Sequence, residues 1–143
     1  MKLPIDLSNR CENILTQLSF VLVESDDFGM SKNYLWQNEM MNLRIINDRG
    51  FYELYVISQK KPIERLVLIK LLRIIKNDTL FYKSELIEAN LLYTLPVNKY
   101  IELLYENYDI IKEYLLDFDQ KKFDSYENYQ NVFDGLLRKF FLG

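Results

Sequence analysis

The chain has 143 residues, of which 49% are hydrophobic and 27% charged, and its formal net charge is −3. This length and composition predict a single globular domain with a buried core and exclude long disordered stretches. Glycine (4 residues) and proline (3) are scarce, which argues against a glycine-rich phosphate-binding loop. No apolar run reaches the roughly 18 residues of a membrane span, and the first residues lack the apolar segment of a signal peptide.

The chain contains one cysteine and no histidine. A single cysteine forms no internal disulfide, which predicts a cytoplasmic location. The lack of histidine excludes Ser-His-Asp and Cys-His catalysis and histidine zinc sites. We therefore expect a protein that is not an enzyme and uses no cofactor, with Cys11 as a small buried side chain.

The charge is unevenly distributed along the chain. Residues 1–58 carry 5 basic and 8 acidic side chains, residues 59–95 carry 7 and 4, and residues 96–143 carry 6 and 9. A basic middle between acidic ends does not predict nucleic-acid binding.

Residues 6–18 are predicted to form a helix capped by Asp6, with Ile14, Leu15 and Leu18 on its buried side. A β-type run follows at residues 20–23.

An acidic segment then follows, which is expected to be a loop. Its carboxylates, Glu24, Asp26 and Asp27, could hold a hard cation. They lack the EF-hand spacing, so a solvated loop without metal is the favoured interpretation.

Residues 33–38 are predicted to form a strand with Tyr34 and Trp36 on one face and Leu35 on the other. Residues 40–47 return as a second strand, and a hairpin continues to residue 58. The pattern predicts an antiparallel meander of three or four strands.

The register of this central hairpin is open between two alternatives. A two-residue loop at Asp48 and Arg49 would place Arg44 opposite Glu53. A type I turn with Gly50 in a left-handed bulge position would shift the pairing by one residue. The presence of glycine at position 50 favours this second alternative.

Residues 63–76 are predicted to form a helix that is apolar nearly all round and lies between the sheet and the C-terminal helices. Its basic side chains, Arg65, Lys70, Arg73 and Lys76, are expected to reach outward to solvent. A further helix is expected over residues 79–95, ended before Pro96. Together these elements predict an α+β fold of one domain over residues 1–143, with an α/β portion at 1–77 and a helical portion at 78–143.

Residues 97–117 are predicted to form one helix with a narrow apolar seam. The seam residues are Ile101, Leu104, Tyr108, Ile111, Leu115 and Phe118. After a polar interruption at residues 119–124, Ser125 is expected to cap a last helix with a similar seam. The seam of that helix is Tyr126, Tyr129, Phe133, Leu136 and Phe140.

The candidate binding site is an acidic stripe on the opposite face of the 97–117 helix. Its residues are Glu102, Glu106, Asp109, Glu113 and Asp117, with Tyr105 and Tyr114 at its two edges. Like charges four residues apart on a helix repel each other, and a basic partner would relieve this repulsion. A merely solvated helix face is the alternative interpretation, so the stripe is a candidate for binding a basic protein.

The order of features in residues 20–75 resembles small bacterial cytoplasmic immunity-type proteins, which accompany polymorphic or contact-dependent toxins. The similar features are a helix and strand, Phe28-Gly29 followed by Asn33, a hairpin with Asn47-Asp48-Arg49-Gly50, and an apolar helix. The resemblance implies a non-enzymatic protein that binds and blocks a toxin enzyme, and it carries over no catalytic residue.

The sequence therefore predicts a bacterial protein-interaction module, an immunity-like inhibitor of a basic partner, with no nucleic acid or membrane among its partners. One alternative is an adaptor that forms homo-oligomers through its tyrosine-rich helices. Another is a carboxylate-based, metal-dependent enzyme near Glu24, Asp26 and Asp27.

Overall fold

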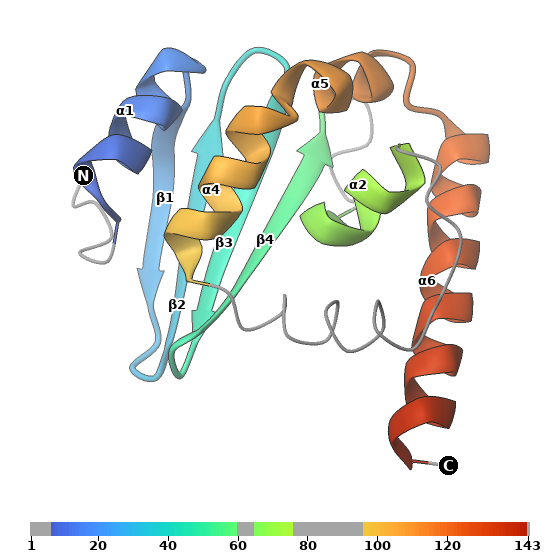
Figure 1. The fold of residues 1–143 in the computed structure, drawn as a ribbon. Helices are drawn as coiled ribbons and strands as arrows, with labels where there is room; N and C mark the ends of the chain where they lie inside the picture. Colours follow the sequence, from blue (N-terminus) through green and yellow to red (C-terminus); the bar gives the residue numbers. More distant parts are fainter. Residues whose placement is uncertain (1–6, 60–64, 76–95, 143) are drawn as a thin grey trace.

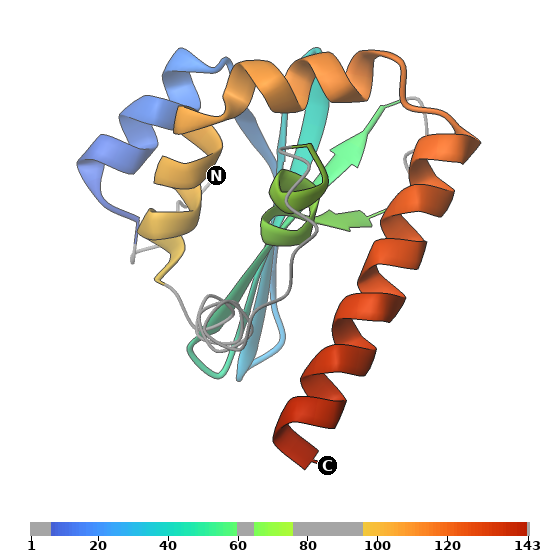
Figure 2. The ribbon, with the colours of Figure 1, turned by 45° about the vertical axis from the view of Figure 1, so that its right-hand side comes forward.

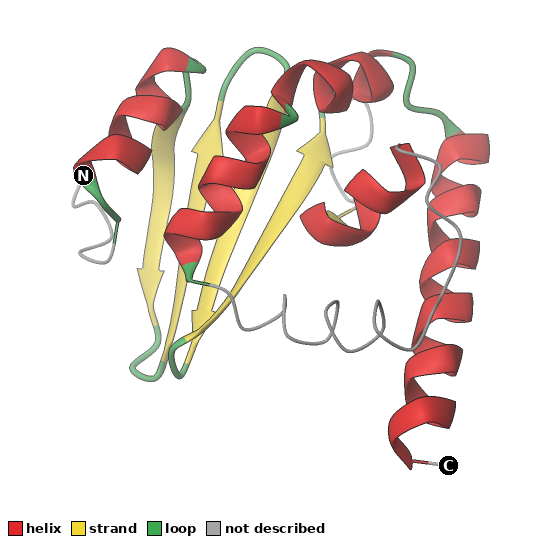
Figure 3. Ribbon diagram, in the orientation of Figure 1, coloured by secondary structure: helices red, strands yellow, loops and turns green. Residues whose placement is uncertain are grey.

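The computed structural model describes residues 7–59, 65–75 and 96–142, without the side chains of residues 133, 134 and 136–142. It confirms the predicted α+β class, because an N-terminal helix, an antiparallel sheet and C-terminal helices pack together (Figures 1 and 3). The helix predicted at residues 79–95 lies outside the described residues.

Helix α1 (Asn9–Gln17) begins two residues after the start of the described chain. Its N-cap is Ser8, whose hydroxyl oxygen accepts a hydrogen bond of 3.2 Å from the Cys11 amide. Ser8 therefore caps this helix, whereas the sequence had predicted Asp6, which lies outside the described residues. The predicted burial of Cys11, Ile14 and Leu15 is confirmed.

The sheet is an antiparallel meander in the order β1-β2-β3-β4-β5, so every neighbouring pair of strands is consecutive in the chain. The strands are β1 (Val21–Asp27), β2 (Ser31–Gln37), β3 (Met41–Asp48), β4 (Phe51–Ser58) and β5 (Arg65–Val67). Two local predictions are wrong. The acidic segment Glu24 to Asp27 extends β1 rather than forming a loop, and residues 65–67 form a strand rather than the start of a helix.

The inner face of the sheet is a continuous row of apolar side chains. In register, Leu22 faces Trp36, Trp36 faces Leu43, and Leu43 faces Val56, which in turn faces Leu66. All five are buried. The strands alternate with period two, and so the predicted division of Tyr34 and Trp36 from Leu35 is confirmed.

The central hairpin turns at Arg49 and Gly50, which matches neither predicted register. Asp48 pairs with Phe51, and Arg49 and Gly50 form the two-residue loop with φ of 56° and 91°. Positive φ at both positions defines a type I′ turn, whose twist matches that of the strands. Asn47 stabilises the turn, because its side-chain oxygen accepts a hydrogen bond of 2.8 Å from the Gly50 amide.

This turn sets the pairing of the whole hairpin. Arg44 lies opposite Tyr55, and Ile46 lies opposite Glu53. The predicted pair of Arg44 with Glu53 is therefore absent from the ladder, and the bulge alternative is also wrong.

Helix α2 (Leu68–Ile75) follows β5 directly and contacts β4, β5, α5 and α6, which confirms its predicted place between the sheet and the C-terminal helices. One detail of the prediction is wrong. Lys70 is only 6% exposed rather than directed to solvent, and it has an interaction partner.

The C-terminal helices are α4 (Val97–Glu106), α5 (Tyr108–Leu116) and α6 (Gln120–Leu142). Helices α1, α4 and α5 lie on one face of the sheet, whereas α6 stands beyond β5, at the opposite end of the sheet from β1 (Figures 1 and 2). Helix α6 begins earlier than predicted because Asp119 caps it, accepting a hydrogen bond of 2.9 Å from the Lys122 amide. Ser125 lies within the helix, where its hydroxyl donates to the Lys121 carbonyl at 3.0 Å.

Candidate functional site

The predicted acidic stripe is divided between two helices. The chain leaves helical geometry at Asn107, with φ −116° and ψ 14°, and resumes as α5. The Asn107 side-chain amide donates to the Leu103 carbonyl at 2.8 Å, in competition with the backbone bond of its own amide to the same oxygen at 3.2 Å. Figure 2 shows the resulting bend between α4 and α5.

The inner sides of both helices match the predicted seam. Ile101, Leu104, Ile111 and Leu115 are at most 3% exposed, and Phe118 is 4% exposed. The acidic residues therefore face away from the core, as the spacing predicted, although the single 97–117 helix was wrong.

Glu102 differs from the other residues of the stripe. Its carboxylate lies 3.6 Å from Arg10 of α1 and 3.9 Å from Lys99, and its side chain is 31% exposed. Next to it, the Asn98 side chain accepts a hydrogen bond of 2.9 Å from the Ser8 amide. Glu102 thus helps to join α1 to α4 and is already neutralised within the fold.

The other four carboxylates are exposed and form what we call the acidic face: Glu106, Asp109, Glu113 and Asp117. None of the ion pairs found within the described residues involves them. Three apolar or aromatic side chains on the same two helices are also exposed, namely Tyr105 (44%), Ile110 (37%) and Leu116 (44%). A surface that combines free carboxylates with exposed aromatic and aliphatic groups is suited to binding another protein.

The two predicted edge tyrosines have different roles. Tyr105 is exposed and lines a depression of about 280 Å³ between α1 and α4. Tyr114 is half-buried, with the Lys122 ammonium 4.6 Å from its ring centre and the Phe118 ring 6.2 Å away. Burial, and secondly the charge of Asp119, raise the pKa of the Tyr114 phenol. Tyr105 is therefore available to a partner, whereas Tyr114 holds α5 against the start of α6.

The acids of β1 are not gathered into a group of metal ligands within the part of the chain that the structure describes. Asp26 lies opposite Asn33 and Asp27 opposite Lys32, so the two carboxylates point to opposite faces of the strand. Among the residues that the structure describes, no group of three or more Cys, His, Asp or Glu side chains could hold a metal ion.

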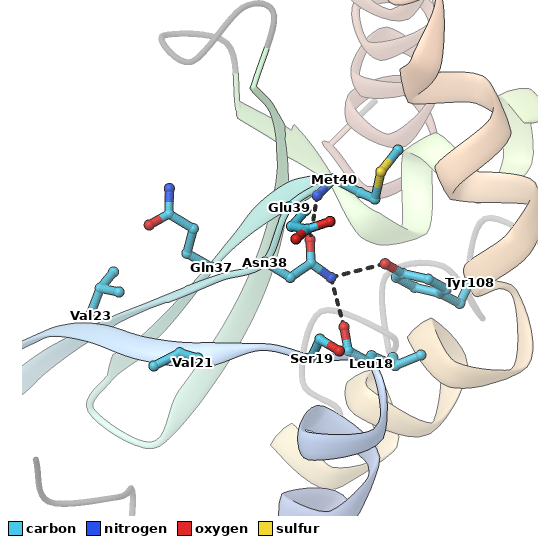
Figure 4. A pocket seen from close by; sticks show the side chains of 9 residues that line it. All are labelled: Leu18, Ser19, Val21, Val23, Gln37, Asn38, Glu39, Met40 and Tyr108. Atoms are coloured by element: carbon cyan, nitrogen blue, oxygen red, sulfur yellow. Dashed lines mark hydrogen bonds between the residues drawn. The ribbon is translucent and has the colours of Figure 1, made fainter.

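A pocket of about 560 Å³ lies where β1 begins (Figure 4). Its lining residues are Leu18, Ser19, Val21, Val23, Gln37, Asn38, Glu39, Met40 and Tyr108. Sequence reasoning missed this pocket, because its walls come from the α1–β1 turn, the β2–β3 turn and the start of α5. The consecutive apolar residues Val21, Leu22 and Val23 were the sequence signal that could have indicated it, because such a run leaves apolar side chains on both faces of a strand; Val21 (63%) and Val23 (38%) are exposed.

Asn38 forms the polar wall of this pocket. Its side-chain nitrogen donates to the Leu18 carbonyl at 2.8 Å and to the Tyr108 hydroxyl at 2.9 Å (Figure 4). Its side-chain oxygen accepts from the amides of Met40 and Met41 at 2.8 and 2.9 Å. Because all four bonds join protein groups, Asn38 ties three segments together and offers nothing further to a ligand.

A second polar cluster lies on the outer face of the sheet. Arg44 donates to the Asn33 side chain at 2.7 Å and lies 3.7 Å from the Glu24 carboxylate. Beside it the Tyr55 hydroxyl donates to Glu53. Burial, and secondly this hydrogen bond, raise the pKa of the Tyr55 phenol, so Tyr55 stays protonated and does not serve as a base at neutral pH.

No protein-family model, curated protein or solved structure matches this chain. The resemblance to immunity-type proteins therefore remains a prediction. No helix within the described ranges is both long and apolar enough to cross a bilayer.

Proposed function

We propose that this protein is a non-enzymatic interaction module, an immunity-like inhibitor that binds a basic partner protein through the acidic face of α4 and α5. The observation that supports this most is the contrast within the predicted stripe. Glu102 is paired with Arg10 and Lys99, whereas the four residues of the acidic face are exposed and form no ion pair within the described residues. A basic surface would supply the counter-charge and would speed association.

Tyr105 provides an aromatic contact at the edge of this face, with Ile110 and Leu116 beyond it. Aromatic residues supply much of the binding energy of protein interfaces when water is excluded around them. The alternative is self-association through the tyrosine-rich helices, and in the last of these helices two tyrosines are buried. Tyr126 and Tyr129 are only 2% and 8% exposed because they pack against the rest of the molecule.

The partner is first identified by co-purification of the tagged protein from its native host, with elution by rising salt. Association rates are then measured for the double variant Glu106→Lys and Glu113→Lys. We expect association at low salt to slow by about tenfold or more, and its dependence on salt to flatten, because both rest on long-range attraction.

The matched control reverses two exposed acids of α6, Asp124→Lys and Glu127→Lys, which makes the same change in net charge. It should leave the rate near that of the wild type. Equal slowing by both variants would show that only net charge matters, and an unchanged rate in the first variant would refute the acidic face as the binding surface. Circular dichroism of both variants verifies the fold.

A further inference from the structure

The two edges of the sheet differ in whether their outward-facing backbone N–H and C=O groups already form hydrogen bonds. At one edge, β5 spans three residues, and the Val67 amide donates a hydrogen bond of 2.8 Å to the Tyr126 hydroxyl of α6. At the other edge, β1 spans seven residues and pairs with β2 alone among the described strands. A long unpaired edge offers hydrogen-bonding groups to an added strand.

Most residues of β1 are exposed to solvent. Leu22 is the one buried residue of this strand, and the other six are exposed. The pairing with β2 shifts between Leu22 and Glu24, which leaves Val23 as a bulge. The bulge lies at the pocket and leaves regular pairing over the rest of the strand, from Glu24 to Asp27.

The side chains along β1 change in character from its start to its end. Val21 and Val23 line the pocket of about 560 Å³ at the start. Glu24, Asp26 and Asp27 follow, and of these Glu24 has an ion pair, with Arg44 at 3.7 Å, yet its side chain is still 54% exposed. A pocket with a mixed polar and apolar lining, which includes both valines, is thus followed by three accessible carboxylates on one strand (Figure 4 shows the two valines and the pocket).

This order of side chains disfavours a second copy of the chain as the occupant. Two β1 strands paired antiparallel about Glu24 would place Glu24 opposite Glu24 and the acidic Asp27 opposite Val21. Like charges directly opposite each other destabilise a strand pair. The same carboxylates attract a strand that carries lysine or arginine.

We propose that the β1 edge binds an extended basic segment of a partner protein, which adds to the sheet as a sixth, antiparallel strand. Because the added strand is antiparallel to β1, its N-terminal residues lie beside Asp27, Asp26 and Glu24. These N-terminal residues are therefore the basic ones. An apolar residue near its end then enters the pocket beside Val21 and Val23. This surface shares no residue with the acidic face of α4 and α5, although Tyr108 at the start of α5 lines its pocket, so variants can test the two surfaces independently.

The test uses a synthetic peptide that begins with consecutive lysines, which reach both faces of the strand, continues with valines and ends in leucine; it is titrated into the full chain by calorimetry. We expect saturable binding, together with slowed hydrogen exchange at alternate amides of β1. A peptide with glutamate in place of lysine should not bind. Reversal of Asp26 and Asp27 to lysine should weaken binding about tenfold, since two exposed charge pairs are lost.

Two backbone-methylated versions of the peptide separate strand addition from simple charge attraction. In a β-ladder only alternate residues point their amides at the neighbouring strand, so methylation of one alternating set should abolish binding and methylation of the other should not. Equal binding by both versions would overturn the proposal.

The variant with Glu106→Lys and Glu113→Lys serves as the control for the other surface, and it should bind the peptide like the wild type. If it alone loses peptide binding, the peptide occupies the acidic face and the β1 proposal is wrong. Sedimentation provides a further test. A dimer that becomes more stable in the variant with Asp26→Lys and Asp27→Lys would overturn the β1 proposal, because the occupant of the edge would then be a second copy of the chain.

Discussion

At one edge of the sheet, the Val67 amide of the three-residue strand β5 is bound by Tyr126, which lies 59 positions further along the chain. At the other edge, the seven-residue strand β1 carries three acids and a bulge, and β2 is the one described strand that pairs with it. Both arrangements prevent uncontrolled strand pairing, the first by a covering helix and the second by charge and irregular geometry. The Tyr126 side chain at the closed edge stabilises the fold, whereas six of the seven residues of β1 at the open edge are exposed.

The largest effect is expected from removing the side chain that closes the β5 edge. Tyr126 is 2% exposed, so Tyr126→Ala should lower the free energy of unfolding by about 3–5 kcal/mol in urea titrations. Tyr126→Phe keeps the ring and should cost roughly 1–2 kcal/mol, because the Val67 amide loses its acceptor.

Hydrogen exchange provides the specific measurement for the closed edge. In Tyr126→Phe the Val67 amide should exchange faster, while the amides of β1 should keep their wild-type rates. If the Val67 amide stays protected in this variant, the Tyr126 hydroxyl does not close the edge.

A second effect is expected at high pH, also on the closed side, where Tyr55 of β4 pairs with Val67 of β5. The pKa of Tyr55 is raised in the folded protein from its ordinary value of 10.0, first by burial and then by its bond to Glu53. Above pH 10 the unfolded chain therefore loses this proton while the folded protein keeps it, so stability falls as the pH rises. Urea titrations at increasing pH should show this decline, and in Tyr55→Phe it should be smaller. An equal decline in both proteins would assign the effect to other groups, of which Tyr114 is one.

The smallest effect is expected at the open edge. Glu24→Gln removes the exposed ion pair with Arg44, and the free energy of unfolding should change by less than about 1 kcal/mol. Asp26→Asn is the matched variant, because Asp26 is exposed on the same strand and has no ion pair within the described residues. A loss of several kcal/mol in either variant would show that these acids stabilise the fold and would remove the contrast between the two edges.

Hydrophobic residues that recur at every second position in a strand and about every 3.6 positions in a helix were sufficient to predict the parts of the fold that depend on burial alone. Tyr34 and Trp36 share one face of β2 as predicted, and Ile101, Leu104, Ile111 and Leu115 point into the core. Such patterns reflect only which side of an element avoids water, and that information is local to each segment.

Predictions failed where a distant segment decided the outcome. Residues 65–67 have an apolar pattern that suits a helix, yet they pair with Tyr55 to Ile57 of β4, whose outer edge would otherwise be unpaired. The hairpin register followed from the Asn47 side chain bonding to Gly50, which a count of turn residues does not reveal.

The candidate site shows the same division between local and distant causes. The spacing of Glu106, Asp109, Glu113 and Asp117 correctly placed them away from the core. The ion pair of Glu102 with Arg10 could not be predicted, because Arg10 belongs to a helix at the other end of the chain, whereas the pair with Lys99 is local to α4.

The sequence by itself determined the α+β class, the inner faces of the strands and helices, and the outward direction of the acids, because each depends on side-chain periodicity. The tertiary structure alone decided which strand edge is closed by Tyr126, which carboxylates are neutralised, and where three segments meet to form a pocket. These features depend on contacts between residues far apart in the chain, and such contacts exist only once the core has brought their elements together.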